Sequence, residues 1–323
     1  YRNNLIGNTV ANGWQQTGPN NWDNGSTSGG NFWSDHPCVD VDKNNICENA
    51  HTVQLNGTDN YPWASQSAWL ATTGTTTWTA DALVSNVSGW SLTPALAVDA
   101  SGNRHLVWQE YASANQLFYA KIAGNGTTVV ATKQLTSDAG SPNSPAAVTD
   151  ANGNLHVAYL LGTTLRYLKV NMAGNVVVNA QLASDVNSRP AIGADGDGNL
   201  HVVWIKLANN NNDVYYQKID GSGNPLVAAK KINSAIDAQW PDLAVDQSGR
   251  VHVVWSGWVS GASYNIKYAR LTKNGVQDIA EKTVVSAANA QNFPALAVDV
   301  LGNLHLAWDD FRVLAQAQDI YYK

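Results

Sequence analysis

The sequence predicts an all-β chain made of five repeats of a four-stranded unit, and three observations support this prediction. Strand and turn formers are abundant and helix formers are scarce, since the 323 residues include 26 Gly, 13 Trp and 12 Tyr but only one Met. A segment of the form Pro-x4-Asp-x2-Gly-x2-His-x2-Trp/Tyr occurs five times, beginning at Pro94, Pro145, Pro190, Pro241 and Pro294. Successive prolines are 51, 45, 51 and 53 residues apart, a period too long for most helical repeats.

Each repeat contains four candidate strands. The first follows the proline, as in "PALAVD", and its small residues suit a crowded axis. The second, as in "NRHLVW", follows an Asp-x-x-Gly turn. The third has a central tyrosine, and a Gly/Asn turn leads from it to the fourth. Four strands in about fifty residues correspond to one propeller blade, so the sequence predicts a five-bladed β-propeller over residues 71–323.

The last repeat ends at Lys323, within its third strand, and so has no fourth strand of its own. Upstream of the first repeat, "TWTADALVSNVSGWSLTP" at residues 77–94 resembles a fourth strand, because Leu83 lies 11 residues before Pro94 as Leu135 lies 10 before Pro145. We therefore expect strand-exchange closure, in which this segment completes the last blade and leaves no long unpaired edge.

The repeats over residues 77–323 resemble those of sialidase-like and lectin-like propellers. The likeness is architectural, because the Asp-x-x-Gly-Asn-x-His-x-x-Trp pattern of the first repeat differs from the Ser/Thr-x-Asp-x-Gly-x-Thr-Trp spacing of the sialidase Asp-box. It implies the propeller fold and does not imply sialidase chemistry.

Residues 1–70 are expected to form a separate extension. Residues 20–63 resemble the closing segment of right-handed β-helix proteins of the family that includes the nitrous-oxide-reductase accessory protein. The matching residues are Gly30, Asn31, Phe32, Trp33, Ser34 and Asp35, followed by Asp59, Asn60, Tyr61 and Pro62. The resemblance implies a β-helix-cap-like or irregular segment, which would serve as an arm or connector.

Cysteine and sequon usage favours an extracellular or cell-surface location. Cys38 and Cys47 are close in sequence and are expected to form a local disulfide. Four Asn-x-Ser/Thr sequons fit the same location as candidate glycosylation sites. They lie at Asn24, Asn56, Asn86 and Asn125.

The loop "DVDKNNICE", between the two cysteines and just beyond, has the oxygen-ligand spacing of calcium sites. Its candidate ligands are Asp40, Asp42, Asn44, the Ile46 carbonyl and Glu48. Two interpretations stay open: a bound Ca²⁺ ion, or a polar turn fastened by the disulfide. No motif for an organic cofactor occurs elsewhere in the chain.

Charge and hydropathy limit the classes of partner. The net charge is −6, and the 19 Lys and Arg residues are scattered, so no basic stripe for nucleic acid is present. No apolar run approaches the ~20 residues of a membrane span. The Asn-, Thr- and Gly-rich composition suits surface sheaths and filaments, and an arm that packed on another copy would give head-to-tail self-association.

The repeated Asp and His residues are expected to be structural, because a catalytic site in a monomer is unique. We expect each Asp to cap its hairpin by accepting turn N–H groups and each His to donate to a buried backbone carbonyl. These residues are Asp99, Asp150, Asp195, Asp246 and Asp299, with His105, His156, His201, His252 and His305.

Variable residues gather instead at the loops between the second and third strands and at the exits between blades, where binding residues tend to lie. Aromatic rings beside carboxylates and amides suit glycan recognition or a surface protein, which favours a non-catalytic binding function. Trp240 and Phe293 could equally fill gaps between blades. The candidate binding residues are Glu110, Tyr111, Arg189, Trp240, Trp258, Phe293, Asp309, Asp310 and Arg312.

The alternative is a carbohydrate-active enzyme, a glycoside hydrolase or lyase, on the same face. Glycoside hydrolysis uses two carboxyl groups on either side of the scissile bond. Glu110 with Asp309 or Asp310 could supply them, since the first and last blades of a closed ring are neighbours. Asp242 is the only acid on a first strand that the repeats do not share.

Overall fold

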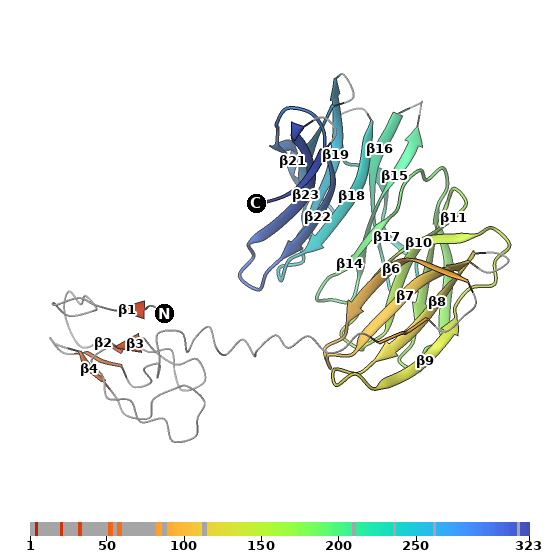
Figure 1. Cartoon of the computed structure of the whole chain (residues 1–323), viewed down its shortest axis with the longest axis horizontal. Coiled ribbons are helices and arrows are strands. Elements are labelled where there is room, and N and C mark those ends of the chain that lie inside the picture. Colours follow the sequence, from red (N-terminus) through yellow and green to blue (C-terminus); the bar gives the residue numbers. More distant parts are fainter. Residues whose placement is uncertain are drawn as a thin grey trace. The chain divides into compact units, whose positions relative to one another are not determined.

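The computed structural model describes residues 4–5, 20–21, 32–33, 51–53, 57–59, 82–85, 89–111, 115–208, 211–234, 237–260, 263–314 and 317–323. The chain divides into two units, Tyr1–Ala82 and Leu83–Lys323, and each is described by itself. All secondary structure in the described residues is β-strand (Figure 1), which confirms the all-β prediction.

The described residues of the first unit contain five short strands. β1 (Asn4–Leu5) pairs in parallel with β3 (Phe32–Trp33), and β2 (Asn20–Asn21) pairs in parallel with β5 (Gly57–Asp59). β4 (His51–Val53) runs antiparallel to β5. The β-helix resemblance and the domain boundary at residue 70 stay predictions. Several predicted sites lie outside the described residues, namely the disulfide Cys38–Cys47, the calcium ligands Asp40, Asp42, Asn44, Ile46 and Glu48, and the sequons at Asn24, Asn56 and Asn86.

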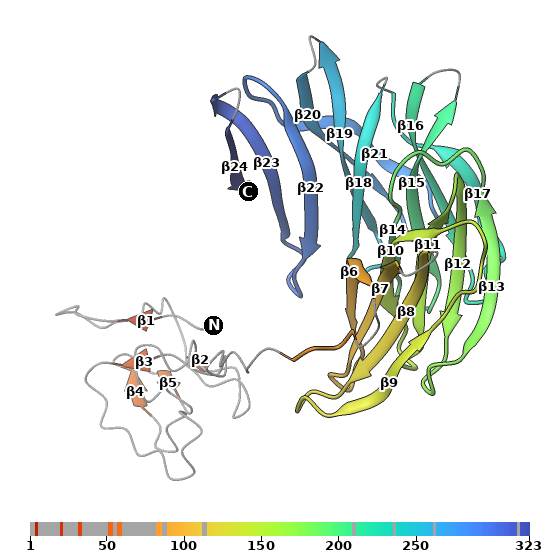
Figure 2. The same cartoon turned by 45° about the vertical axis from the view of Figure 1, so that its right-hand side comes forward.

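The second unit consists of five antiparallel sheets, called blades one to five, which follow one another around an axis (Figure 2). Blade one comprises β6 (Trp90–Val98), β7 (Arg104–Tyr111), β8 (Asn115–Ile122) and β9 (Thr128–Gln134). Blade two comprises β10 (Pro142–Thr149), β11 (Leu155–Leu161), β12 (Thr164–Val170) and β13 (Val176–Ala183). Blade three comprises β14 (Ala191–Ala194), β15 (Leu200–Ala208), β16 (Asn211–Ile219) and β17 (Pro225–Lys231).

Blade four comprises β18 (Ala238–Val245), β19 (Val251–Ser260), β20 (Ser263–Leu271) and β21 (Gln277–Val285). Blade five comprises β22 (Gln291–Val298), β23 (Leu304–Leu314) and β24 (Ala317–Tyr322). The first strand of each blade contacts the first strand of the next. The arrangement confirms the prediction of five propeller blades, each beginning near a repeated proline.

Successive blades pack face to face through alternating side chains of their strands. Between blades one and two, Val107 and Tyr119 meet Leu155, Val157 and Tyr159 in a fully buried cluster. Equivalent clusters fill the next three interfaces. Because burying one large apolar side chain stabilises a fold by ~1.5–3 kcal/mol, these interfaces hold the array together.

Strand exchange, which we expected from residues 77–94, is not found in the described part of the chain. The sheet of blade five has three strands, β22, β23 and β24. Residues 90–94 instead belong to β6, where Trp90 pairs with Tyr111 of β7. Residues 82–85 form no strand, and the Val84 carbonyl accepts a hydrogen bond from Thr132 Oγ1 of β9 (2.6 Å).

The outward faces of blades one and five carry side chains that the interior blades bury. Tyr322 of β24 is 67% exposed, whereas its counterparts Tyr119, Tyr167 and Tyr216 are fully buried. Leu96 and Val98 of β6 are exposed on blade one. Among the described residues, the two faces therefore have the composition of a blade interface but no blade packed against them.

Candidate ligand-binding site on the propeller axis

The aspartate of each repeat caps the hairpin between the first two strands, as predicted. Asp99 Oδ1 accepts hydrogen bonds from the backbone N–H groups of Ser101 (3.0 Å) and Asn103 (2.9 Å). The other four aspartates make the same pair of contacts. The fivefold aspartate is therefore a turn-forming residue.

The prediction for the histidines was wrong, because their partners are side chains and not backbone carbonyls. His156 Nε2 lies 3.1 Å from Asp150 Oδ2, and Nδ1 lies 2.8 Å from the Tyr167 hydroxyl. The Tyr167 hydroxyl also donates to the Gly221 carbonyl of blade three (3.0 Å). The reason is geometric: the tyrosine of the third strand reaches across its own sheet to the imidazole. The equivalent histidine and tyrosine pairs are His105–Tyr119, His201–Tyr216, His252–Tyr268 and His305–Tyr322.

Burial keeps the interior histidines neutral. It lowers the pKa of His201 to about 4, with the charge of Lys218 acting in the same direction. Burial alone would raise the pKa of Asp195, but hydrogen bonds from Lys218 and Asn199 outweigh it and bring the value to about 2. At neutral pH each interior pair thus combines a neutral imidazole with a carboxylate, both enclosed by protein, which is a structural arrangement.

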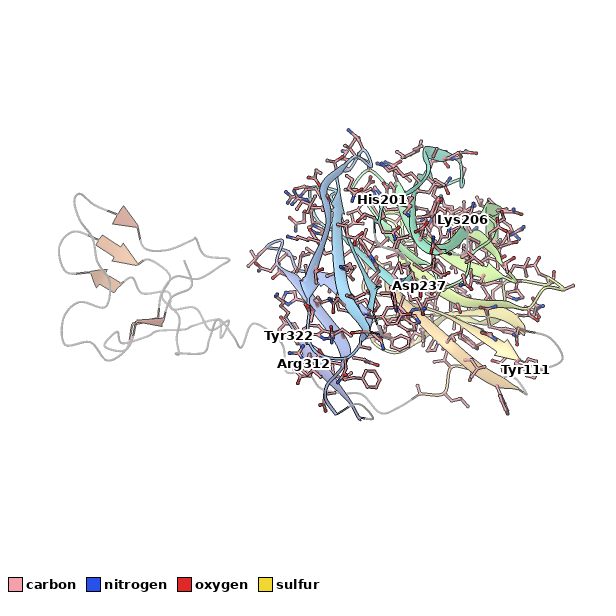
Figure 3. All side chains as sticks on the ribbon, turned by 90° about the horizontal axis from the view of Figure 1, so that it is seen from above. Tyr111, His201, Lys206, Asp237, Arg312 and Tyr322 are labelled. Atoms are coloured by element: carbon pink, nitrogen blue, oxygen red, sulfur yellow. The ribbon has the colours of Figure 1, made fainter. Side chains whose placement is uncertain are left out.

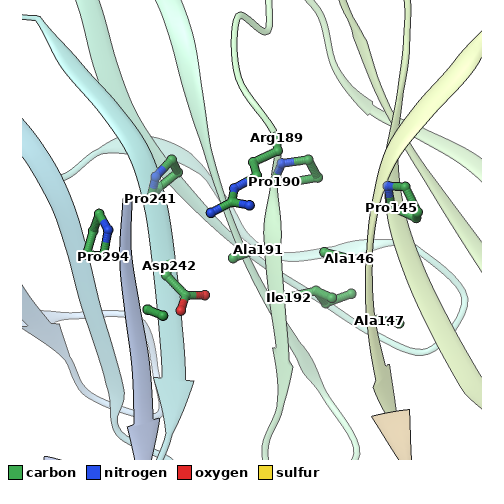
Figure 4. Close-up of a pocket in the computed structure, with 11 residues that line it drawn as sticks. Pro145, Ala146, Ala147, Arg189, Pro190, Ala191, Ile192, Pro241, Asp242 and Pro294 are labelled. Atoms are coloured by element: carbon green, nitrogen blue, oxygen red, sulfur yellow. The ribbon is translucent and has the colours of Figure 1, made fainter. Parts of the chain in front are cut away.

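A pocket of about 300 Å³ lies where the first strands begin, and we call it the axial pocket (Figure 4). Four of the repeated prolines and several small side chains form its walls. The lining residues are Pro145, Ala146, Ala147, Arg189, Pro190, Ala191, Ile192, Pro241, Asp242, Pro294 and Ala295. Because proline has no N–H group, few donors face this space.

The residue before the proline occupies a β-bulge in four of the five blades. Thr93, Ser144, Trp240 and Phe293 have φ between 47° and 51°, in the left-handed region that non-glycine residues rarely adopt. The register of the first two strands shifts at the same points. Blade three differs, because its first strand begins only at Ala191 and the equivalent residue is Arg189.

Arg189 and Asp242 are the two charged residues that line the axial pocket, and Figure 4 shows both side chains directed into it. Asp242 is half-buried, and its Oδ2 accepts a hydrogen bond from the Leu296 N–H (2.7 Å). Burial raises the pKa of Asp242, although the N–H groups of Leu296 and Leu243 and the charge of Arg189 oppose the shift. Within the described residues, the Arg189 guanidinium has no hydrogen bond or ion pair.

Two predicted binding residues, Trp240 and Phe293, pack together, and each directly precedes in sequence a proline that lines the pocket. Their ring centroids are 4.1 Å apart, and Trp240 also lies 6.0 Å from the ring of Tyr264. Phe293 is 41% exposed, so this cluster presents an aromatic surface as well as filling space between blades four and five. Trp258 pairs with Tyr264 across β19 and β20. Sequence reasoning missed Tyr264, since every third strand is rich in aromatic residues.

Glu110 and Asp310, two of the carboxylates considered for catalysis, are hydrogen-bonded within their own blades. Buried Glu110 accepts hydrogen bonds from Trp108 Nε1 (3.0 Å) and Ser91 Oγ (2.7 Å). Buried Asp310 accepts from Trp308 Nε1 (2.8 Å) and from the backbone N–H of Arg312 (2.8 Å).

These residues stand apart. Figure 3 shows Tyr111, next to Glu110, and Arg312, near Asp310, on opposite sides of the unit, and Arg312 stacks on Tyr321 at 4.0 Å. Asp309 pairs with Asn292 and Ile320 in its own sheet. No described hydrogen bond or ion pair joins Glu110 to Asp309 or Asp310.

The described residues offer little support for other kinds of site. Within them, no cluster of three His, Cys, Asp or Glu side chains could hold a metal ion. No helix in that part of the chain has the length and hydropathy of a transmembrane span. The sequon residue Asn125 lies exposed in the turn between β8 and β9, where its Oδ1 accepts from the Thr127 N–H (3.0 Å).

No protein-family profile matches the chain, and comparison with curated proteins finds no relative. Solved structures are similar in fold. A protein of unknown function from Dyadobacter fermentans aligns at 10% identity over 68% of this chain and 75% of its own, with a TM-score of 0.50. An endo-arabinase from Bacteroides thetaiotaomicron aligns at 12% identity over 71% and 92% (TM-score 0.44). An α-L-arabinofuranosidase from Lactobacillus brevis aligns at 8% over 72% and 90% (TM-score 0.44). At such identities the likeness concerns the fold alone.

Proposed function

We propose that this propeller binds carbohydrate in the axial pocket. The observation that carries the proposal is that Arg189 and Asp242 line the pocket, while Trp240 and Phe293, whose rings pack together, directly precede two of its lining prolines in sequence. Sugars present apolar C–H faces and a belt of hydroxyl groups, so they need both kinds of surface.

The size and walls of the pocket support the same proposal. At about 300 Å³ it lies at the lower end of the range for small-ligand sites, which suits one sugar residue better than a long chain. Proline and alanine walls accept C–H groups, and because the prolines offer no N–H group, Arg189 and Asp242 would fix the orientation of the bound hydroxyls.

A second candidate is a carbohydrate-active enzyme, and the observation in its favour is Asp242. A carboxyl group whose pKa is raised by burial keeps its proton longer and can act as a general acid. The described lining supplies one carboxyl group, whereas hydrolysis through paired carboxyls needs two. Several similar solved structures carry names of glycoside hydrolases or of a polysaccharide lyase, at 8–12% identity.

Glycan-array binding and a polysaccharide-degradation screen, run on the same preparation, test both candidates. Binding without release of sugar supports the first. Turnover that Asp242→Asn abolishes supports the second, provided that Asp319→Asn, a change of an exposed carboxylate on β24, leaves turnover intact. Absence of both binding and turnover across a broad array would refute the proposal.

A further inference from the structure

Arg189 breaks the fivefold pattern at the residue before the proline. The equivalent residues in the other blades are Thr93, Ser144, Trp240 and Phe293, none of them charged. Those four share the bulged backbone with positive φ, while Arg189 lies in a segment without that bulge, two residues before β14 begins. Blade three thus differs from its neighbours in both backbone and charge at this position, and of the five equivalent residues Arg189 is the one that lines the axial pocket.

The Arg189 guanidinium is available to a ligand. It is solvent-exposed and has no hydrogen bond or ion pair within the described residues. The nearby carboxyl group of Asp242 accepts a hydrogen bond from the Leu296 N–H instead. Burial raises the pKa of Asp242, so this carboxyl is protonated more easily than an exposed one. In its protonated form it does not repel an incoming anion.

We propose that the axial pocket selects saccharides that carry a carboxylate, such as uronic acids, with the Arg189 guanidinium pairing with that carboxylate and Asp242 binding a neighbouring hydroxyl. This inference rests on the proposed carbohydrate-binding function. A planar guanidinium forms two parallel hydrogen bonds with a carboxylate, which fixes the orientation of the ligand as well as adding affinity. The proline walls would then face the C–H surface of the sugar ring.

The test compares methyl β-D-glucuronide with methyl β-D-glucoside, which differ only in the carboxylate, by isothermal titration calorimetry at 0.15 M salt. We expect the glucuronide to bind about tenfold more tightly or better, because hydrogen bonds to charged groups are worth more than neutral ones. Arg189→Gln should abolish this preference, and Arg189→Lys should retain part of it. Arg166→Gln is the matched control, since Arg166 contacts Asn179 on the outer strands of blade two (2.7 Å).

Three outcomes separate this inference from the function on which it rests. A preference for the glucuronide that Arg189→Gln removes, with an unchanged melting temperature, supports it. Equal binding of both glycosides, or a preference that survives Arg189→Gln, overturns the inference and leaves carbohydrate binding intact. If neither glycoside binds, and glycosides of galactose, arabinose and galacturonic acid do not bind either, the proposed carbohydrate-binding function is refuted.

Discussion

The hydroxyl of the third-strand tyrosine joins one hairpin to the next blade. In blade two the Tyr167 hydroxyl contacts His156 Nδ1 of its own sheet and the Gly221 carbonyl of blade three. His156 is fully buried, so its Nδ1 depends on this hydroxyl for a hydrogen bond, whereas Gly221 is half-buried. One oxygen atom thereby couples the position of a buried imidazole to the position of the neighbouring blade.

Tyr167→Phe should lower the free energy of unfolding by about 1–3 kcal/mol, because it leaves the buried His156 Nδ1 without a partner and removes the hydrogen bond to the Gly221 carbonyl of the next blade. Tyr322→Phe is the matched control: the contact with His305 is the same, but Tyr322 is largely exposed, and we expect a loss below about 0.5 kcal/mol. Urea unfolding of the two variants makes the comparison. Equal losses would show that the hydroxyl does not act through burial.

Glu110 allows a residue-scale test of the enzymatic alternative. Glu110→Ala should destabilise the fold by about 1–3 kcal/mol, because Trp108 Nε1 and Ser91 Oγ lose a buried acceptor. Glycan binding, measured by calorimetry, should stay the same. A stable variant that had lost turnover would instead return Glu110 to the catalytic candidates.

At the scale of the element, the turn between the third and fourth strands carries the contact between blades. Gly223 has φ +85°, and a Cβ there would lie 3.0 Å from Ala180 Cβ and 3.1 Å from Tyr167 Cδ1 of blade two. Gly174 and Gly275 meet the tyrosines of their preceding blades in the same way. Gly126 of blade one has φ +89° but nothing within 4 Å.

Gly223→Ala should therefore destabilise the protein more than Gly126→Ala. Both substitutions incur a similar backbone penalty at positive φ, but only the first forces atoms into a packed interface, which typically costs about 1–3 kcal/mol more. Thermal unfolding of both variants gives the difference directly. A difference near zero would mean that blades two and three separate without cost at this turn.

The same elements show how far sequence reasoning reached. The repeated Pro, Asp, Gly and His residues located the hairpins correctly, because turn chemistry and strand alternation are local. Strand exchange is not found among the described residues, and the likeness of residues 77–94 to a fourth strand does not reveal that residues 90–92 pair with β7. The axial pocket could not be predicted from the sequence, because its walls are mostly prolines that every repeat shares. Arg189 and Asp242 are the lining residues that differ between repeats.

At the scale of the whole molecule, the buried Asp and His residues make stability dependent on pH. Burial lowers the pKa of His201 to about 4 and also lowers those of His105, His156 and His252. The unfolded chain takes up these protons near pH 6.5, before the folded chain does. Stability is therefore complete above that pH and declines as pH falls toward 4.

A second decline should follow below about pH 4, where Asp195 and Asp246, whose pKa values are about 2 in the fold, acquire protons first in the unfolded chain. Unfolding midpoints measured from pH 8 to pH 3 test both steps. We expect His201→Gln to reduce the loss of unfolding free energy between pH 6.5 and pH 4, because His201 alone accounts for about 3 kcal/mol of that loss. Unchanged midpoints between pH 7 and pH 4 would contradict the assignment.

The unmatched faces of blades one and five have a consequence for how the molecule comes apart. In a row of similar units, stability is the sum of each unit's own contribution and its coupling to its neighbours, so a unit with one neighbour melts more easily than a unit with two. Fraying should begin at the ends of the row and move inward. Amide hydrogens of β24 in blade five and β7 in blade one should exchange with solvent before those of β15, because blade three packs against a neighbouring blade on each side.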